Sequence, residues 1–179
     1  MKQVKMYGLG GQGVVTAAKL FAEAVAIGEG KNAQSIPAYG HERRGAPVYA
    51  DVIFSEEPIK VKSFVYDPDY IVIFDLAVLD KGVDVMVGSN PKSIFVINAE
   101  CILTEYPFAN HEVYYVGARG IALDTIGSDI PNSAMLGAMA GAGLVGINAV
   151  TEVVSNYFVK AGNSNAKATK QAFDRLRKN

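Results

Sequence analysis

Two short runs of consecutive apolar residues constrain the fold of this chain more than any other feature of its sequence. Residues 70–74 read Tyr-Ile-Val-Ile-Phe, and residues 94–97 read Ile-Phe-Val-Ile. Strands of this composition are covered on both faces, which is typical of parallel sheets with helices packed against them. A weaker strand is expected at 112–116. Strands that alternate with helices predict an α/β fold with a largely parallel sheet.

The other elements follow from the spacing of apolar residues along the chain. Further strands are expected at 3–7, 32–37, 48–54 and 59–64. Helices are expected at 12–27, 118–126, 132–158 and 165–177. The last two of those strands should form an antiparallel hairpin across a turn, and the third helix should break near 146–148. The sequence thus predicts one three-layer α/β domain over residues 1–179. Its sheet should be mixed but mostly parallel, with a β-hairpin insertion and a Rossmann-like first βα unit.

Composition narrows the class of protein. The chain has 179 residues, of which 50% are hydrophobic and 20% are charged, as in a globular domain with a substantial core. Its net charge of −1 gives no overall field that would attract nucleic acid or an anionic membrane. The longest apolar run, residues 134–147, is shorter than the roughly 20 residues of a membrane span. No signal peptide is visible. We therefore expect neither a nucleic-acid nor a membrane partner.

Cys101 is the single cysteine of the chain. One cysteine excludes an internal disulfide framework, and it excludes a zinc or iron–sulfur site made only of this chain's thiolates. We expect Cys101 to be a buried structural thiol, in a protein of the reducing cytoplasm.

Charge is distributed unevenly along the chain. Residues 160–179 carry six basic groups and one acidic group, whereas residues 1–159 carry eleven basic and seventeen acidic groups, a net of −6. The basic helix expected at 165–177 has two interpretations: a solvated terminal helix, or a docking element for an acidic partner.

A glycine-rich loop follows the first predicted strand and precedes a helix, which is the context of a phosphate-binding turn. Its candidate ligand-binding residues are Gly8, Gly10, Gly11, Gln12 and Gly13. N–H groups at the start of the following helix favour an anion. However, no acid ends the second strand to hold a ribose, and no Walker lysine follows the loop. Two interpretations therefore remain ahead of independent NAD or ATP binding. One is chain reversal with subunit packing, and the other is contact with an anionic ligand shared with another subunit.

A second motif, at 37–48, carries four charged or titratable residues in a row between glycines and prolines: His41, Glu42, Arg43 and Arg44. Loops bounded by glycine and proline in this way tend to expose their side chains at the protein surface. The forked donors of Arg43 and Arg44 suit carboxylate or phosphate. No second His or Cys stands at metal-ligand spacing from His41. An Arg–Glu network that braces the loop is the alternative.

Two further polar residues stand at element ends. Asn132 precedes an apolar helix and should act as its N-cap, with a ligand contact as the alternative. Asp75 ends a buried strand, at the edge where open α/β sheets bind ligands, although capping of residues 76–79 is the favoured role. The helix after Asn132 contains several glycines, which lower its intrinsic stability but let neighbouring backbones approach closely, so this helix should be tightly packed.

Taken together, three segments resemble the gamma subunit of 2-oxoacid:ferredoxin oxidoreductases. They are Gly-Leu-Gly-Gly-Gln-Gly-Val-Val-Thr-Ala-Ala at 8–18, Pro-Ala-Tyr-Gly-His-Glu-Arg-Arg-Gly-Ala-Pro-Val at 37–48, and Pro-Asn-Ser-Ala-Met-Leu-Gly-Ala at 131–138. The form Glu-Arg-Arg-Gly-Ala-Pro-Val looks most like pyruvate-type members. The resemblance spans residues 3–177.

The resemblance implies an accessory subunit of a complex that oxidatively decarboxylates a 2-oxoacid to an acyl-CoA and CO2. Thiamine diphosphate, Mg and iron–sulfur clusters would belong to alpha, beta and delta-type partner subunits, and ferredoxin or flavodoxin would receive the electrons. This chain would support assembly and could contribute to the coenzyme A pocket. The residues it would offer are Gly8, Gly10, Gly11, Gln12, Gly13, Arg43, Arg44 and Asn132. No residue is expected to be catalytic or to bind a metal. A stand-alone nucleotide- or anion-binding module is the alternative.

Overall fold

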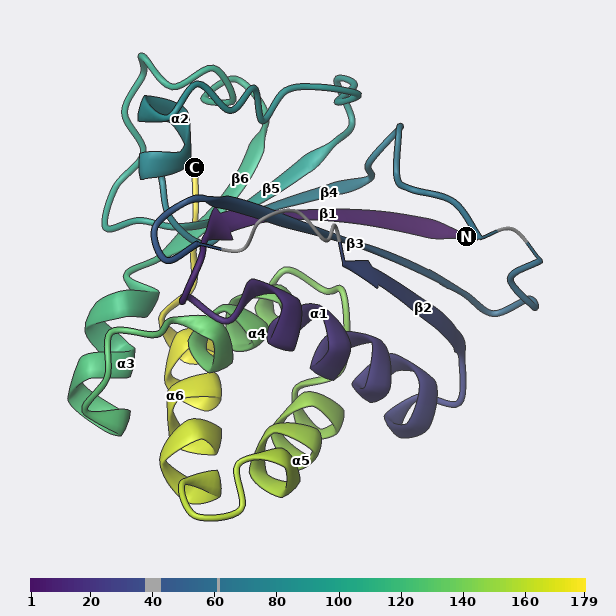
Figure 1. Cartoon of the computed structure of the whole chain (residues 1–179), viewed down its shortest axis with the longest axis vertical. Coiled ribbons are helices and arrows are strands. Elements are labelled where there is room, and N and C mark those ends of the chain that lie inside the picture. The colour runs from purple at the N-terminus through teal and green to yellow at the C-terminus, as the bar shows by residue number, and fades with distance from the viewer. Residues whose placement is uncertain (38–42, 61) are drawn as a thin grey trace.

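A seven-stranded mixed sheet forms the centre of the protein in the computed structural model, which describes residues 1–37, 43–60 and 62–179 (Figure 1). The strands are β1 (Lys2–Leu9), β2 (Asn32–Pro37), β3 (Pro47–Ser55), β4 (Tyr70–Ile73), β5 (Ile94–Asn98), β6 (Glu112–Val116) and β7 (Arg177–Lys178). The helices are α1 (Val14–Glu23), its π-helical continuation η1 (Ala24–Gly28), α2 (Ala77–Asp80), α3 (Ala118–Ile126), α4 (Asn132–Gly141), α5 (Ile147–Tyr157) and α6 (Gly162–Arg175). The sheet order is β2-β3-β1-β4-β5-β6-β7.

Four adjacent strands, β1, β4, β5 and β6, are parallel, and the outer strands β3, β2 and β7 pair antiparallel with their neighbours. The apolar runs predicted at 70–74 and 94–97 are β4 and β5, which lie inside the parallel region. The predicted α/β class with a mixed sheet is confirmed.

Apolar side chains alternate between two cores, one on each face of the sheet. On β4, Val72 faces the larger core, which packs against the helices, whereas Ile71 and Ile73 face the smaller one. Figure 1 shows α1, α3, α4, α5 and α6 on one face of the sheet and α2 with long loops on the other. The protein therefore has three layers, as predicted.

The predicted hairpin of 48–54 with 59–64 is wrong. The first segment is β3, but both of its edges are occupied, by β1 and β2, so no edge remains for the second. In the described part of 59–64, which omits residue 61, the chain forms no strand. The antiparallel pair in this region is β2 with β3 instead.

The segment after 59–64 crosses the face of the sheet and is fixed there by a buried ion pair. Val65 N donates to Asp51 Oδ2 (2.8 Å), and Lys5 Nζ donates to Val65 O (2.8 Å) while lying 3.3 Å from Asp51 Oδ1. Burial raises the pKa of Asp51, and the Val65 N–H and the Lys5 ammonium act in the opposite direction. Burial likewise raises the pKa of Tyr7, on the same face, to about 12.

Several element ends differ from prediction. The helix expected from residue 12 begins at Val14, because Gly13 has a left-handed φ of 74°. The helix expected at 132–158 is broken, but earlier than the predicted 146–148: residues 142–146 separate α4 from α5, and residues 147 and 148 belong to α5. Cys101 is exposed, not buried, because it lies in the loop after β5. No described helix has the length and apolar character needed to cross a bilayer.

The basic tail does not remain helical to residue 177. Leu176 leaves the helical region (φ −59°, ψ 135°), and the chain continues as β7 along β6. Lys178 Nζ lies 2.9 Å from Glu112 Oε1, and the Asn179 amide bonds to β6 and the loop before it. The last residue of the helix predicted at 165–177 therefore belongs to a strand of the sheet.

The glycines of α4 permit a close crossing with α6, as expected from its composition. A Cβ on Gly137 would collide with the Thr169 carbonyl oxygen. Beside this contact, Ser133 Oγ donates to Asn165 Oδ1 (2.6 Å) and Thr169 Oγ1 donates to Ser133 O (2.9 Å), all buried. Close backbone approach and a satisfied polar network therefore fix the two helices together.

We predict that Gly137→Ala destabilises the fold by about 3 kcal/mol or more, because helix α6 must move away from the added methyl group. Gly120→Ala is the matched control, since a Cβ at that helical position meets only Glu100 Oε1 at 3.9 Å. It should be neutral or stabilising by up to about 1 kcal/mol. Urea denaturation measures both. Equal stabilities of the two variants would contradict the close crossing.

We also predict a pH-dependent attachment of β7. Hydrogen bonds from Lys178 and then Tyr114 lower the pKa of Glu112 from its ordinary value of 4.5. Because its pKa is lowered in the folded state, ionised Glu112 stabilises the fold above pH 4.5. This stabilisation is lost as the pH falls through the folded-state pKa of Glu112. Hydrogen-exchange protection of Arg177 and Lys178 should fall over that range. In Glu112→Gln this part of the pH dependence should be absent, whereas Glu57→Gln should behave like the unchanged protein.

Candidate functional site

The two motifs singled out in the sequence meet at the carboxyl end of β1. The ladder of β1 with β3 places Leu9 opposite Pro47, so the residues just beyond both strands also face each other. Gly10 N donates to Ala46 O (2.8 Å), and Gly45 N donates to Gly10 O (3.0 Å). The glycine loop and the arginine loop are thereby joined by reciprocal backbone hydrogen bonds.

Three of the loop glycines are required by their neighbours. A Cβ on Gly10 would collide with the Arg43 carbonyl oxygen, and one on Gly8 would lie 2.6 Å from Val14 Cγ2. Gly13 combines its positive φ with close packing, since a Cβ there would lie 2.5 Å from Asn132 Nδ2. Gly11, with a φ of 98°, instead has open space around it apart from the Arg44 side chain. Gly11 is thus the glycine that leaves room for a ligand.

Gln12 braces the loop through both ends of its amide. Leu9 N donates to Gln12 Oε1 (2.7 Å), and Gln12 Nε2 donates to Asp75 Oδ2 (2.5 Å). Asp75 Oδ1 accepts from Ala77 N (2.9 Å), which is the capping role favoured from the sequence. The Gln12 side chain is therefore engaged within the chain, and so is its backbone N–H, which donates to Leu9 O (3.1 Å).

Asn132 is the first residue of α4 and not its N-cap, which is Pro131. Its side-chain Oδ1 still accepts a hydrogen bond from a first-turn amide, that of Ser133 (2.8 Å). The side chain is buried against Gly13. The Asn132 side chain therefore packs against the glycine loop and helps to hold its shape.

A cleft of about 500 Å³ opens beside the joined loops. It is lined by Gly10, Gly11, Arg43, Arg44, Ser128, Asp129 and Ile130. A hollow of about 280 Å³ lies over the start of α1, where the first amide groups of the helix have no partner within it. The two hollows share Gly10 and Gly11, so the two predicted arginines line a cleft that adjoins the positive end of a helix, an arrangement suited to phosphate or carboxylate.

A neighbouring hollow of about 200 Å³ adds Arg119, which the sequence analysis missed. Arg119 Nη2 lies 3.0 Å from Asp129 Oδ2. Features of the sequence could have identified both residues. Arg119 stands in the first turn of the helix after β6, at the carboxyl edge of the sheet, and Asp129 just precedes the recognised segment at 131–138.

Strand order explains why the loop lacks the other parts of a dinucleotide site. β3 lies between β1 and β2, so the strand that follows α1 is not the neighbour of β1. An acid at the end of that strand would be displaced by one strand from its position in a dinucleotide fold.

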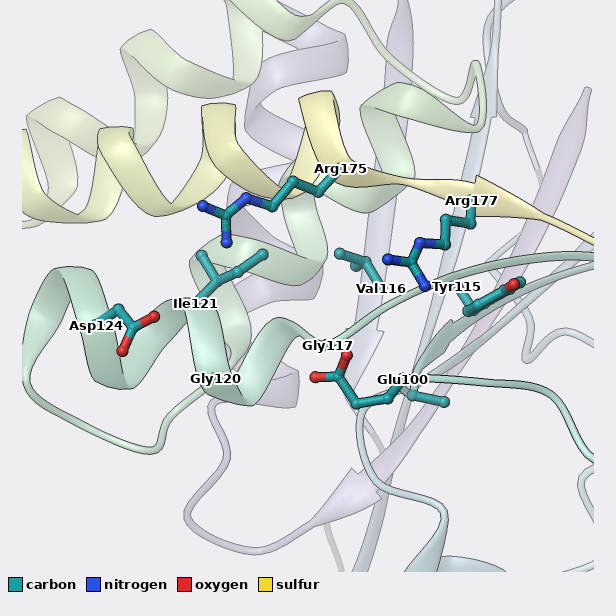
Figure 2. Close-up of a pocket in the computed structure, with 10 residues that line it drawn as sticks. Glu100, Tyr115, Val116, Gly117, Gly120, Ile121, Asp124, Arg175 and Arg177 are labelled. Atoms are coloured by element: carbon teal, nitrogen blue, oxygen red, sulfur yellow. The ribbon is translucent and has the colours of Figure 1, made fainter.

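A separate cavity of about 210 Å³ lies between α3, α6 and β7 (Figure 2). Figure 2 shows Arg175 and Arg177 on one wall and Glu100 and Asp124 on the other. The Glu100 carboxylate lies directly against Gly117, where α3 begins. The position that an anion would take at this helix end is therefore filled by the chain's own carboxylate, which distinguishes this cavity from the glycine cleft.

No metal centre is evident: within residues 1–37, 43–60 and 62–179, no three His, Cys, Asp or Glu side chains are grouped to hold an ion. His41 and Glu42 lie outside the described residues, so the alternative of a bracing Arg–Glu network stays a prediction.

The chain matches proteins of known family over nearly its whole length. The family model described as pyruvate ferredoxin/flavodoxin oxidoreductase matches residues 3–175. Pyruvate synthase subunit PorC of Methanothermobacter marburgensis is 38% identical over 99% of this chain and 98% of its own. The common subunit gamma of the pyruvate/ketoisovalerate oxidoreductases of Pyrococcus abyssi is 41% identical over 98% of this chain and 97% of its own.

Solved structures share the fold. Pyruvate oxidoreductase subunit PORC of Thermotoga maritima superposes with a TM-score of 0.83 at 27% identity, covering 99% of this chain and 97% of that one. The 2-oxoglutarate:ferredoxin oxidoreductase of Magnetococcus marinus gives a TM-score of 0.73 at 22% identity, over 97% of this chain and 30% of that longer chain. The resemblance noted in the sequence is therefore confirmed, and the chain belongs to the pyruvate ferredoxin/flavodoxin oxidoreductase family, as a subunit of the gamma type.

Proposed function

We propose that this chain is a non-catalytic gamma subunit whose glycine cleft binds the phosphate groups of coenzyme A in a pyruvate-type oxidoreductase complex. The observation that carries the proposal is the junction of the two loops, which brings Gly11, Arg43 and Arg44 to one cleft beside the start of α1. Two relatives named above are subunits of pyruvate-linked enzymes. The Magnetococcus enzyme was solved with 2-oxoglutarate, coenzyme A and succinyl-CoA bound.

The role of the cleft is to hold and orient an anion. Guanidinium groups offer forked donors to phosphate, and the amides at the start of α1 add partial positive charge. A charge-assisted hydrogen bond of this kind contributes about 1.5–3 kcal/mol. Anchoring the nucleotide end of coenzyme A leaves its thiol free to reach the acyl group formed on the partner subunits.

The redox chemistry would belong to those partners. An iron–sulfur cluster needs several cysteine ligands, and this chain has one cysteine. Alpha, beta and delta-type subunits would thus carry thiamine diphosphate, Mg and the clusters, and would pass electrons to ferredoxin or flavodoxin. Nothing in the comparisons supports the alternative of a stand-alone nucleotide-binding module.

We predict that Arg43→Gln and Arg44→Gln each raise the KM for coenzyme A about tenfold or more in the assembled complex, because each removes a charged phosphate donor. The KM for pyruvate, and kcat at saturating coenzyme A, should stay unchanged. Arg175→Gln, in the separate cavity of Figure 2, is the control and should leave all three constants unchanged. An unaltered KM for coenzyme A in both loop variants would reject the proposal.

We further predict that the isolated chain does not reduce ferredoxin with pyruvate and coenzyme A, because the groups that form the carbanion and take its electrons lie elsewhere. A tagged chain expressed in its native host should co-purify with larger subunits, and that preparation should have the activity. Recovery of the tagged chain alone, without activity, would argue against a role in a complex.

A further inference from the structure

The Arg119–Asp129 pair lines the hollow that adjoins the cleft of Gly11, Arg43 and Arg44, and it is open to solvent. The two side chains are 62% and 56% exposed, and Nη2 and Oδ2 are 3.0 Å apart. An ion pair this exposed is weak, since water competes with it on both sides. A stronger partner can therefore replace either member at little cost.

The backbone of Arg119 is fixed to the same sheet edge as the glycine loop. Arg119 N donates to Asn98 Oδ1 (3.3 Å), and Asn98 Nδ2 donates to Phe74 O (2.9 Å). These contacts connect the first turn of α3 to the carboxyl ends of β4 and β5. Only the side chain of Arg119 is left to move between partners.

Arg119 and Asp129 share one hollow with Arg44 and the Gly10–Gly11 backbone. Asp129 also lines the larger cleft together with Arg43. The second carboxylate of the hollow, Asp75, is already occupied by Gln12 and by the amide of Ala77. Counting described residues only, the hollow itself holds two arginines and two carboxylates, a net charge of zero. Arg43 of the adjoining cleft brings the total to +1, and loss of the Asp129 charge would bring it to +2.

We infer that Arg119 and Arg44 form a subsite for a diphosphate group, and that Asp129 is the internal counter-ion which the ligand displaces from Arg119. Carboxylate and phosphate both accept two parallel hydrogen bonds from a guanidinium, but a diphosphate carries at least two negative charges where Asp129 carries one, so the diphosphate replaces Asp129 on Arg119. A singly charged ligand lacks this advantage. The subsite therefore selects diphosphates over monoanions. Its assignment to coenzyme A rests on the function proposed above, whereas the diphosphate chemistry does not.

The test is a calorimetric titration of the full-length chain with inorganic pyrophosphate, and with acetate as the monoanion. Asp129→Asn should tighten pyrophosphate binding by about two- to fivefold, because the competing carboxylate charge is gone. Arg119→Gln should weaken it by about tenfold or more. In the double variant the gain from Asp129→Asn should disappear, since Arg119 is the group that Asp129 occupies. Asp124→Asn, an acid of α3 in the other cavity, is the control and should change nothing.

Three results would overturn the inference: no binding of pyrophosphate by either the unchanged chain or Asp129→Asn, no effect of Asp129→Asn, or a gain that persists without Arg119. All the changed side chains are exposed, and thermal unfolding checks that each variant is folded. The kinetic test of Arg43 and Arg44 separates this inference from the proposed function. If the Asp129 and Arg119 variants change pyrophosphate binding as expected but the Arg43 and Arg44 variants leave the KM for coenzyme A unchanged, the subsite is supported and the coenzyme A role is rejected. If the KM for coenzyme A rises but pyrophosphate binding does not respond to the Asp129 and Arg119 variants, only the subsite is rejected.

Discussion

The antiparallel register of β1 against β3 is the constraint on which the candidate site depends. With Leu9 opposite Pro47, the backbones of Gly10 and Ala46 arrive side by side and form hydrogen bonds. A slip of one residue would separate those groups and would also turn the apolar residues of β3 away from the core. The burial of β3 therefore fixes the register, and the register in turn brings together two loops that are distant in the sequence.

The sequence predicted well those elements whose signal is local. The runs at 70–74 and 94–97 became central strands because consecutive apolar residues can be satisfied only where both faces are covered. The segment at 59–64 has a similar alternating pattern but forms no strand among its described residues, since both edges of β3 are taken. Whether a strand edge is free to pair depends on the whole sheet, and the sequence of the segment itself does not indicate it. The end of α6 was missed for the same reason, because β7 exists only where the edge of β6 is free to receive it.

The parts of the candidate site that lie in loops rich in glycine and proline were identified from the sequence. The part that lies on the surface of helix α3 was missed. Glycine spacing and a pair of arginines identified both loops that meet at the cleft. Arg119 stands in the first turn of α3, and its place beside the glycine loop depends on how that helix follows β6 at the edge of the assembled sheet. Gln12 and Asn132 were both named as candidate ligand-binding residues, and the structure shows that their side chains hold the shape of the glycine loop.

The position of β1 has a consequence for how the chain is made. It precedes the other strands in the sequence, yet it lies inside the sheet, between β3 and β4. Until Tyr70–Ile73 has been synthesised, one edge of this apolar strand has no partner, and such open edges are where nascent chains associate wrongly. Folding of the parallel region must therefore wait for distant segments, which makes it slow relative to local helix formation. In a complex-forming subunit, that interval is when chaperones or early partner contacts would matter most.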